Sequence, residues 1–312
     1  MKKIHQIEPL GINDELQNYY CQIAQRHGFE VKYWHDRPST KQKLIQRCKG
    51  ADCIILSNIP IDKEVLDALP DLKMISVAFT GLDHIDMEEC LKREIIVKNA
   101  AGYSTTSVAE LTIAMVLCLY RSIVNNATKT LNGEGRNGYT GTELSGKTVG
   151  IVGMGRIGGE TARLFQAFGC TTIAWNRTVK KIEGVRFVSL ETLLSNADIV
   201  SIHLPLTPET RGLINDKKLS FMKPGTILIN TARGPIIDTE ALCAALNNNK
   251  IAGAALDVFD IEPPLPADYP LLKTKNVILL PHIAYATYEA FEKRAKIVYD
   301  NIFTYDLPSP LQ

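Results

Sequence analysis

TVGIVGMGRIG, at residues 148–158, predicts a buried strand that runs into a glycine-rich turn and then a helix. Gly153, Gly155 and Gly158 have the spacing Gly-x-Gly-x-x-Gly. In such a turn the first glycine makes the bend, the second lets the backbone approach a pyrophosphate, and the third lets the helix pack on the strand. The N-terminus of the helix favours the phosphate. A flexible turn is the alternative, but a second strand at 171–176 favours dinucleotide binding.

The end of that second strand, which reads AWNRT, predicts which dinucleotide binds. Sites for NAD usually place an Asp or Glu here, hydrogen-bonded to the ribose 2'-hydroxyl. Asn176 stands in its place, and Arg177 and Thr178 can donate hydrogen bonds to a 2'-phosphate, with Lys180 and Lys181 nearby. We therefore expect NADP(H) as the cofactor. NAD is the alternative if Arg177 only covers the adenine face.

The pattern of apolar runs predicts an α/β protein with two domains. A chain of 312 residues exceeds the size at which one hydrophobic core usually keeps growing. Short apolar runs alternate with helical patterns in both halves, which is typical of parallel sheets buried on both faces. The expected strands are 3–7, 30–34, 53–56 and 74–78, then 148–152, 171–176, 197–202, 225–230, 251–256 and 276–280, with long helices over 104–123 and 287–305.

Composition excludes several classes of function. The formal net charge of +1 provides no field that would attract nucleic acid or an anionic membrane. The seven cysteines include no Cys-x-x-Cys pair, so we expect free thiols in a reducing compartment and no metal site. The N-terminus lacks the apolar region of a signal peptide, which predicts a cytoplasmic protein. The most apolar stretch, Leu111 to Tyr120, is shorter than the roughly 20 residues that span a bilayer, so we expect a buried helix and no membrane partner.

Three motifs in the second half carry candidate catalytic residues: NTARG at 230–234, DVFDIEP at 257–263 and PHIA at 281–284. Each follows an apolar run, and the carboxyl ends of parallel strands border one ligand crevice. The planar fork of Arg233 suits the carboxylate of a 2-oxo acid, and His282 suits proton donation near neutrality, with Glu262 as its carboxylate partner. Each residue alone is more often structural, but three at matching strand ends favour catalysis.

Together with the glycine turn and HLPLTPET at 203–210, these motifs resemble the D-isomer-specific 2-hydroxyacid dehydrogenase family over nearly the whole chain. The resemblance implies that Arg233 binds the substrate carboxylate, that Glu262 and His282 form the acid/base pair, and that Asp257 orients the nicotinamide. It implies a substrate loop of Phe79, Thr80, Gly81 and Leu82, together with Arg233. It implies cofactor contacts from Gly153, Gly155, Arg156, Ile157, Gly158, Asn176, Arg177, Thr178, His203, Pro205, Thr210, Thr231, Ala232, Asp257 and His282.

The same resemblance implies the architecture and the partners. We expect two doubly wound parallel-sheet domains: a smaller, flavodoxin-like substrate domain of residues 1–101 plus 285–312, and a Rossmann dinucleotide-binding domain of residues 102–284. The long helix after Gly102 is expected to form a homodimer interface. The C-terminal regulatory domain of some phosphoglycerate dehydrogenases is expected to be absent.

The expected activity is NAD(P)-dependent reduction of a small 2-oxo acid to a D-2-hydroxy acid, or the reverse, with glyoxylate or hydroxypyruvate and NADPH favoured. Two alternatives come from the same superfamily. A dinucleotide-sensing interaction protein would need no turnover, and the complete set of Arg233, Glu262 and His282 favours an enzyme instead. A formate dehydrogenase would be expected to carry Gln in place of Glu262.

Overall fold

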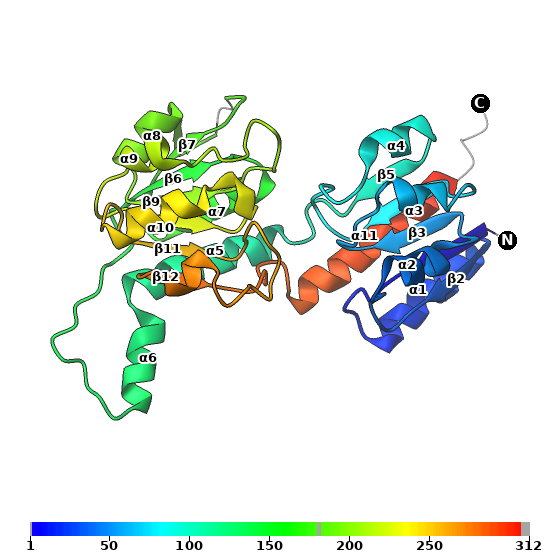
Figure 1. Cartoon of the computed structure of the whole chain (residues 1–312), viewed down its shortest axis with the longest axis horizontal. Coiled ribbons are helices and arrows are strands. Elements are labelled where there is room, and N and C mark those ends of the chain that lie inside the picture. The colour runs from blue at the N-terminus through cyan, green and yellow to red at the C-terminus, as the bar shows by residue number, and fades with distance from the viewer. Residues whose placement is uncertain (1, 180–181, 307–312) are drawn as a thin grey trace. The chain divides into compact units, whose positions relative to one another are not determined.

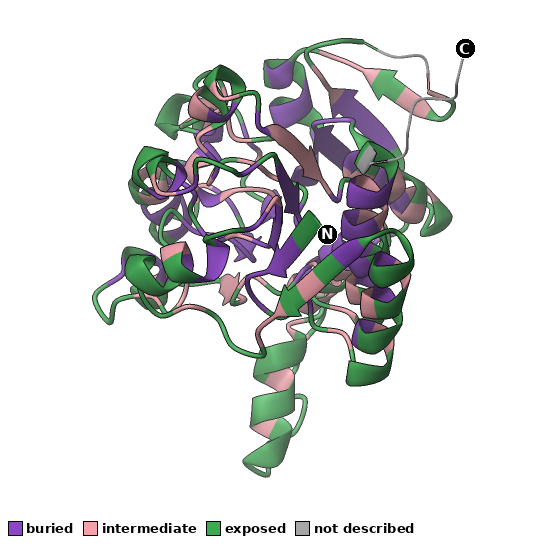
Figure 2. Ribbon diagram, turned by 90° about the vertical axis from the view of Figure 1, so that its right-hand side faces the viewer, coloured by how far each residue is buried: buried purple, intermediate pink, exposed green. Residues whose placement is uncertain are grey.

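A computed structural model describes residues 2–179 and 182–306 and divides the chain into two compact units (Figure 1). The first unit is Met1–Ser104 with Ala286–Gln312, and the second is Thr105–Tyr285. Each unit contains one parallel sheet with helices packed against it. Figure 2 shows buried residues along the strands and on one side of most helices, with exposed residues on the opposite side.

The sheet of the first unit has the strand order β2-β1-β3-β4-β5. Its central strands β3 and β4 are apolar or small at every position and fully buried, because helices cover both faces of the sheet. The last helix, α11, is anchored to β4, since the Ser76 hydroxyl donates to the Val298 carbonyl at 2.9 Å. The elements are β1 (Lys2–Gln6), α1 (Asp14–Arg26), β2 (Phe29–Tyr33), α2 (Lys41–Cys48), β3 (Cys53–Leu56), α3 (Lys63–Asp67), β4 (Met74–Val77), α4 (Met87–Lys92), β5 (Ile96–Asn99) and α11 (Tyr288–Asp306).

The sheet of the second unit has the strand order β12-β11-β10-β9-β6-β7-β8. From β6 the chain continues to β7 and β8 on one side of the sheet, and then to β9, β10, β11 and β12 on the other side. A topological switch point therefore lies between β6 and β9, and open α/β sheets bind ligands at such a point. The elements are α5 (Thr105–Tyr120), α6 (Ile123–Leu131), β6 (Thr148–Val152), α7 (Arg156–Ala167), β7 (Thr171–Trp175), β8 (Val185–Phe187), α8 (Leu190–Asn196), β9 (Ile199–Ile202), α9 (Asp216–Ser220), β10 (Ile227–Asn230), η1 (Gly234–Ile236), α10 (Thr239–Asn247), β11 (Gly253–Leu256), η2 (Pro270–Lys273) and β12 (Val277–Leu279). The predicted fold class, two parallel-sheet α/β domains, is confirmed.

The long apolar helix expected over 104–123 is shorter than predicted. It ends at Tyr120, and after Ser122, which has a positive φ of 44°, the chain bends into α6. Within the described residues no single helix is long and apolar enough to cross a membrane; α5 and α6 pass that test only as a pair, bent by 60°. All seven cysteines carry free thiols.

Candidate active site

The glycine turn between β6 and α7 is shaped by three glycines with different roles. Gly153 has φ 105°, and a Cβ there would lie 2.6 Å from the His203 carbonyl oxygen. A Cβ on Gly158 would lie 2.0 Å from the Gly153 oxygen, so the fold itself requires glycine at both positions. A Cβ on Gly155 would meet nothing within 4 Å, which leaves space for a ligand beside the backbone. Because α7 begins without a side-chain cap or an acidic first turn, its N-terminus fits a pyrophosphate.

Asn176, which follows β7, hydrogen-bonds to this turn. Its Oδ1 accepts the Met154 N–H at 3.2 Å, and its Nδ2 donates to the Thr178 carbonyl at 2.8 Å. The residues expected to meet a 2'-phosphate, Arg177 and Thr178, are exposed. The sequence pattern identified Asn176 only by the missing acid, and its contact with the turn depends on the fold. The two lysines that we expected nearby, 180 and 181, lie outside the described residues.

The segment after β9 is held by its own side chains. His203 hydrogen-bonds through Nε2 to the Ser201 hydroxyl at 2.8 Å, and desolvation lowers the pKa of His203 to about 3. The Thr210 hydroxyl accepts the Thr207 N–H at 2.8 Å and donates to the Pro205 carbonyl at 2.7 Å, which closes a turn beside the switch point. Because its pKa is lowered to about 3, His203 is neutral at physiological pH.

After β10, a buried amide shapes the segment that carries Arg233. Asn230 is fully buried, accepts the Ala232 N–H at 3.0 Å and donates to the Arg233 carbonyl at 2.9 Å. The Thr231 hydroxyl lies 3.1 Å from that of Thr112 on α5. A half-buried Arg233 therefore leaves the strand end in a fixed turn, with its Nη1 bonded to the Ala232 carbonyl at 2.7 Å.

The segments after β11 and β12 bring Asp257, Glu262 and His282 together. Asp257 is fully buried and accepts the N–H groups of Ile283 and Ala284, each at 2.8 Å. Burial raises the pKa of the Asp257 carboxyl, and these two donors oppose the rise. The buried carboxylate thus fixes the backbone next to His282, which has the unusual φ of 57°.

Glu262 and His282 form a pair with an acid/base geometry. Nδ1 of His282 lies 3.0 Å from one carboxylate oxygen of Glu262 and 3.1 Å from the other. The imidazole is 13% exposed and the carboxylate 64%. Because Nδ1 is held by the carboxylate, Nε2 is the nitrogen that can exchange a proton with a substrate.

Gly234 brings the Arg233 segment against the Glu262 segment. A Cβ on Gly234 would lie 1.9 Å from the Phe259 carbonyl carbon, so the two backbones are in direct contact. The prediction did not single out Gly234 or Asn230, although a glycine directly after a strand-end arginine was a signal for a close approach. All three predicted catalytic side chains therefore follow strands at one edge of one sheet.

The predicted substrate loop, Phe79–Asp83, follows β4 in the first unit. The Phe79 carbonyl accepts the Ala100 N–H at 3.0 Å, and Asn99 donates to the Thr80 carbonyl at 2.6 Å. Within residues 2–179 and 182–306, the N–H groups of Thr80, Gly81 and Leu82 make no hydrogen bond to the protein, which suits a loop that binds a carboxylate through its backbone.

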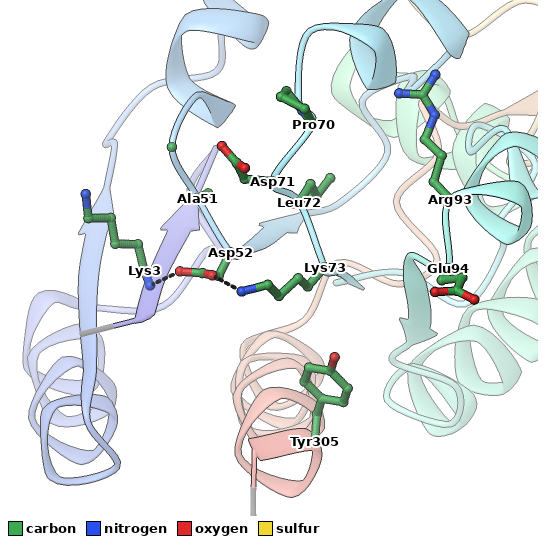
Figure 3. Close-up of a pocket in the computed structure, with 11 residues that line it drawn as sticks. Lys3, Ala51, Asp52, Pro70, Asp71, Leu72, Lys73, Arg93, Glu94 and Tyr305 are labelled. Carbon is green, nitrogen blue, oxygen red and sulfur yellow. Dashed lines mark hydrogen bonds and ion pairs between the residues drawn. The ribbon is translucent and has the colours of Figure 1, made fainter.

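An open cavity of about 650 Å³ lies at the opposite edge of the first sheet (Figure 3). It is lined by Tyr305 of α11 and by residues just before or at the start of the strands, where Asp52 accepts the Lys3 N–H at 2.9 Å and the Lys73 ammonium at 2.7 Å. Parallel sheets bind ligands at the carboxyl ends of their strands, whereas this cavity lies at the amino ends. We therefore place the candidate site at the other edge.

A dinucleotide turn and a histidine held by a carboxylate, both at the carboxyl ends of strands of one sheet, characterise an oxidoreductase that uses a nicotinamide cofactor. Comparison with known proteins agrees: residues 113–284 match the family described as D-isomer specific 2-hydroxyacid dehydrogenase, NAD binding domain, and the chain belongs to this family. The resemblance predicted from the motifs is confirmed.

Three similar proteins illustrate the match. The chain is 45% identical to a glyoxylate reductase of Thermofilum pendens, over 88% of this chain and 83% of that protein. The crystal structure of a glyoxylate reductase from Paecilomyes thermophila superposes with a TM-score of 0.89 at 29% identity, over 100% and 97% of the two chains. An acyclic imino acid reductase in complex with NADPH and D-Arg superposes with a TM-score of 0.88 at 32% identity, over 97% and 96%.

Proposed function

We propose that the chain reduces a small 2-oxo acid, glyoxylate or hydroxypyruvate, to the D-2-hydroxy acid with NADPH. The observation that carries this proposal is the bifurcated contact of His282 Nδ1 with both carboxylate oxygens of Glu262, at the sheet edge that also carries Arg233. Arg233 binds the substrate carboxylate, and Nε2 of His282 donates a proton to the carbonyl oxygen while Glu262 holds the ring. The nicotinamide, when bound, supplies the hydride. In oxidation the same imidazole accepts the proton.

Several features support NADPH as the reductant. No carboxylate stands at position 176 to repel a 2'-phosphate, and exposed Arg177 and Thr178 follow it directly. Asn176 joins this segment to the glycine turn, so the residues expected to contact the 2'-phosphate and the pyrophosphate belong to one bonded unit. The imino acid reductase with a similar fold was determined with NADPH.

The relatives and the loops also support the proposed substrate and a role for each domain. The glyoxylate reductases among the relatives support a short 2-oxo acid, and the loop of Phe79, Thr80 and Leu82 would line its side-chain pocket. We assign substrate binding to residues 1–101 plus 285–312 and cofactor binding to residues 102–284.

The experiment is a grid of initial rates with glyoxylate, hydroxypyruvate, pyruvate and phenylpyruvate, each with NADPH and with NADH. We expect turnover of one of the first two acids with a preference for NADPH. Arg177→Gln should lower kcat/KM for NADPH about 10- to 100-fold and leave NADH unchanged, because one charge-assisted hydrogen bond to the phosphate is lost.

Arg163→Gln is the matched control, since Arg163 is an exposed arginine of α7 that pairs with Glu160. This substitution should leave kcat/KM unchanged for both NADPH and NADH. Tight dinucleotide binding without turnover of any acid would contradict the proposal and favour a dinucleotide-sensing protein.

We further propose a homodimer. The long helix after Gly102 was expected to form its interface, but much of α5 is buried within the described structure, so we assign the interface to α6. No residue of this helix is buried, and it carries three apolar side chains, Ile123, Val124 and Leu131, that are 47%, 59% and 88% exposed. A second copy of the chain would cover these apolar side chains. Light scattering should give twice the chain mass, and Val124→Asp should shift the protein toward the monomer; a wild-type monomer would overturn the proposal.

A further inference from the structure

Tyr269 lies where the exposed segment that carries Glu262 returns to the core. The chain leaves the core after Phe259, and residues 260–262 are exposed. Tyr269 is 5% exposed, and its hydroxyl donates to the Asp260 carboxylate. This hydrogen bond spans nine residues and joins the two ends of the loop.

The tyrosine ring also supports the start of the loop. It packs edge-on against Phe259, with ring centroids 6.0 Å apart and an interplanar angle of 88°. The Phe259 backbone in turn lies against Gly234, directly after Arg233. One buried side chain therefore contacts Phe259 and Asp260, which link the Arg233 segment to Glu262.

Glu262 depends on such support because its own side chain has little. Its carboxylate is 64% exposed, yet it must stay within hydrogen-bonding distance of His282 Nδ1. Holding a loop two residues away limits the positions that the carboxylate can sample. Burial and the bond to Asp260 raise the pKa of Tyr269 to about 12, so the hydroxyl keeps its proton over the working pH range.

We propose that Tyr269 is a positioning residue: through Asp260 it holds Glu262 in the geometry that orients His282. The inference rests on the proposed reductase function, but it concerns a residue that the motifs do not include. The Tyr269 ring keeps the loop packed, and the Tyr269 hydroxyl sets the position of the Asp260 carboxylate. The two contributions can therefore be separated by substitution.

The test is Tyr269→Phe, which removes only the hydroxyl. We expect kcat to fall about tenfold with little change in KM for NADPH, because acid/base geometry is disturbed and the cofactor turn is not. Asp260→Ala should lower kcat by a similar factor, and the double variant should fall no further than either single one. Asp260→Asn should retain most of the activity, since an amide oxygen still accepts the bond.

Tyr299→Phe is the matched control. Tyr299 is fully buried in the first unit, where its hydroxyl accepts a hydrogen bond from Gln17 and donates one to Gln6, each at 3.0 Å. Its loss should lower the melting temperature without changing kcat. Equal kcat values for Tyr269→Phe and the wild type would overturn the inference, even if Tyr269→Phe melts earlier.

A second readout needs no turnover. The proton on His282 Nδ1, assigned by its loss in His282→Gln, should give a downfield NMR signal that Tyr269→Phe broadens and Tyr299→Phe preserves. An unchanged signal in Tyr269→Phe would overturn the positioning role. If the wild type reduces no 2-oxo acid, the proposed function fails, and this signal still decides the role of Tyr269.

Discussion

Two strand ends of the second unit each carry a histidine, and the surroundings of the two rings differ. His203 follows β9, hydrogen-bonds to the Ser201 hydroxyl and is desolvated, so its pKa is lowered to about 3. His282 follows β12, is held by the Glu262 carboxylate at 3.0 Å and stays 13% exposed. The comparison shows that the sheet edge alone does not make a histidine catalytic. The carboxylate partner distinguishes the ring suited to proton transfer.

The largest expected difference between the two rings is in turnover. His282→Gln should lower kcat about 100- to 10,000-fold, because the proton donor is lost. His203→Gln should leave kcat within about threefold of the wild type, since a neutral ring cannot supply the proton. Steady-state loss of NADPH absorbance measures both.

Dinucleotide binding by fluorescence titration is the control for folding of each variant. A drop in kcat of similar size for both variants would end the distinction, because His203 would then take part in the chemistry or the cofactor geometry. Activity of His282→Gln near that of the wild type would remove the basis of the proposed mechanism.

A smaller effect separates the two histidines through stability. The folded pKa of His203 lies near 3 and the unfolded value near 6.5, so the unfolded state binds the extra proton as the pH falls below 6.5. The stability tied to this group is fully present above pH 6.5 and is lost as the pH falls toward 3. Between pH 7 and pH 5 the loss should be about 2 kcal/mol.

Urea unfolding of the wild type and of His203→Gln at pH 5, 6 and 7 measures this term by difference. The free energy of unfolding of the wild type should decline more steeply toward pH 5. Parallel curves for the two proteins would show that His203 is accessible to protons in the folded state, and the contrast with His282 would no longer hold.

These strand ends also show what sequence could and could not predict. Central strands such as β3 (CIIL) were predictable because parallel strands buried on both faces are apolar at every position. The edge strands β5 (IVKN) and β8 (VRF) were missed, since they are short, only partly buried and interrupted by a charged residue. The end of the long helix was also missed. Apolar residues continue through the bend at Ser122 into α6, so the hydrophobic pattern does not show where the first helix ends.

The candidate site divides in the same way. Arg233, Glu262 and His282 stood out because ionisable side chains directly after apolar runs share one sheet edge. The contacts that hold them were not predictable: Asp257 with the N–H groups of Ile283 and Ala284 joins segments 26 and 27 residues apart. Such contacts depend on the register between strands, which no local pattern contains.

The smallest expected effect concerns another charged residue after β9. Glu209 is exposed, and its pKa is lowered first by a hydrogen bond with Thr207 and also by the charge of Arg177. A carboxylate that interacts with the charge of Arg177 competes with a 2'-phosphate for the guanidinium. Glu209→Gln should therefore lower KM for NADPH about two- to threefold and leave KM for NADH unchanged. The difference from the wild type should disappear at high salt, because exposed charges interact weakly and are screened.

Glu143→Gln, at an exposed position in the same unit, should change KM for neither cofactor. An equal gain with NADH would mean that Glu209 acts on the turn closed by Thr210 and not on cofactor choice, so that the β9 end would contribute to the fold alone.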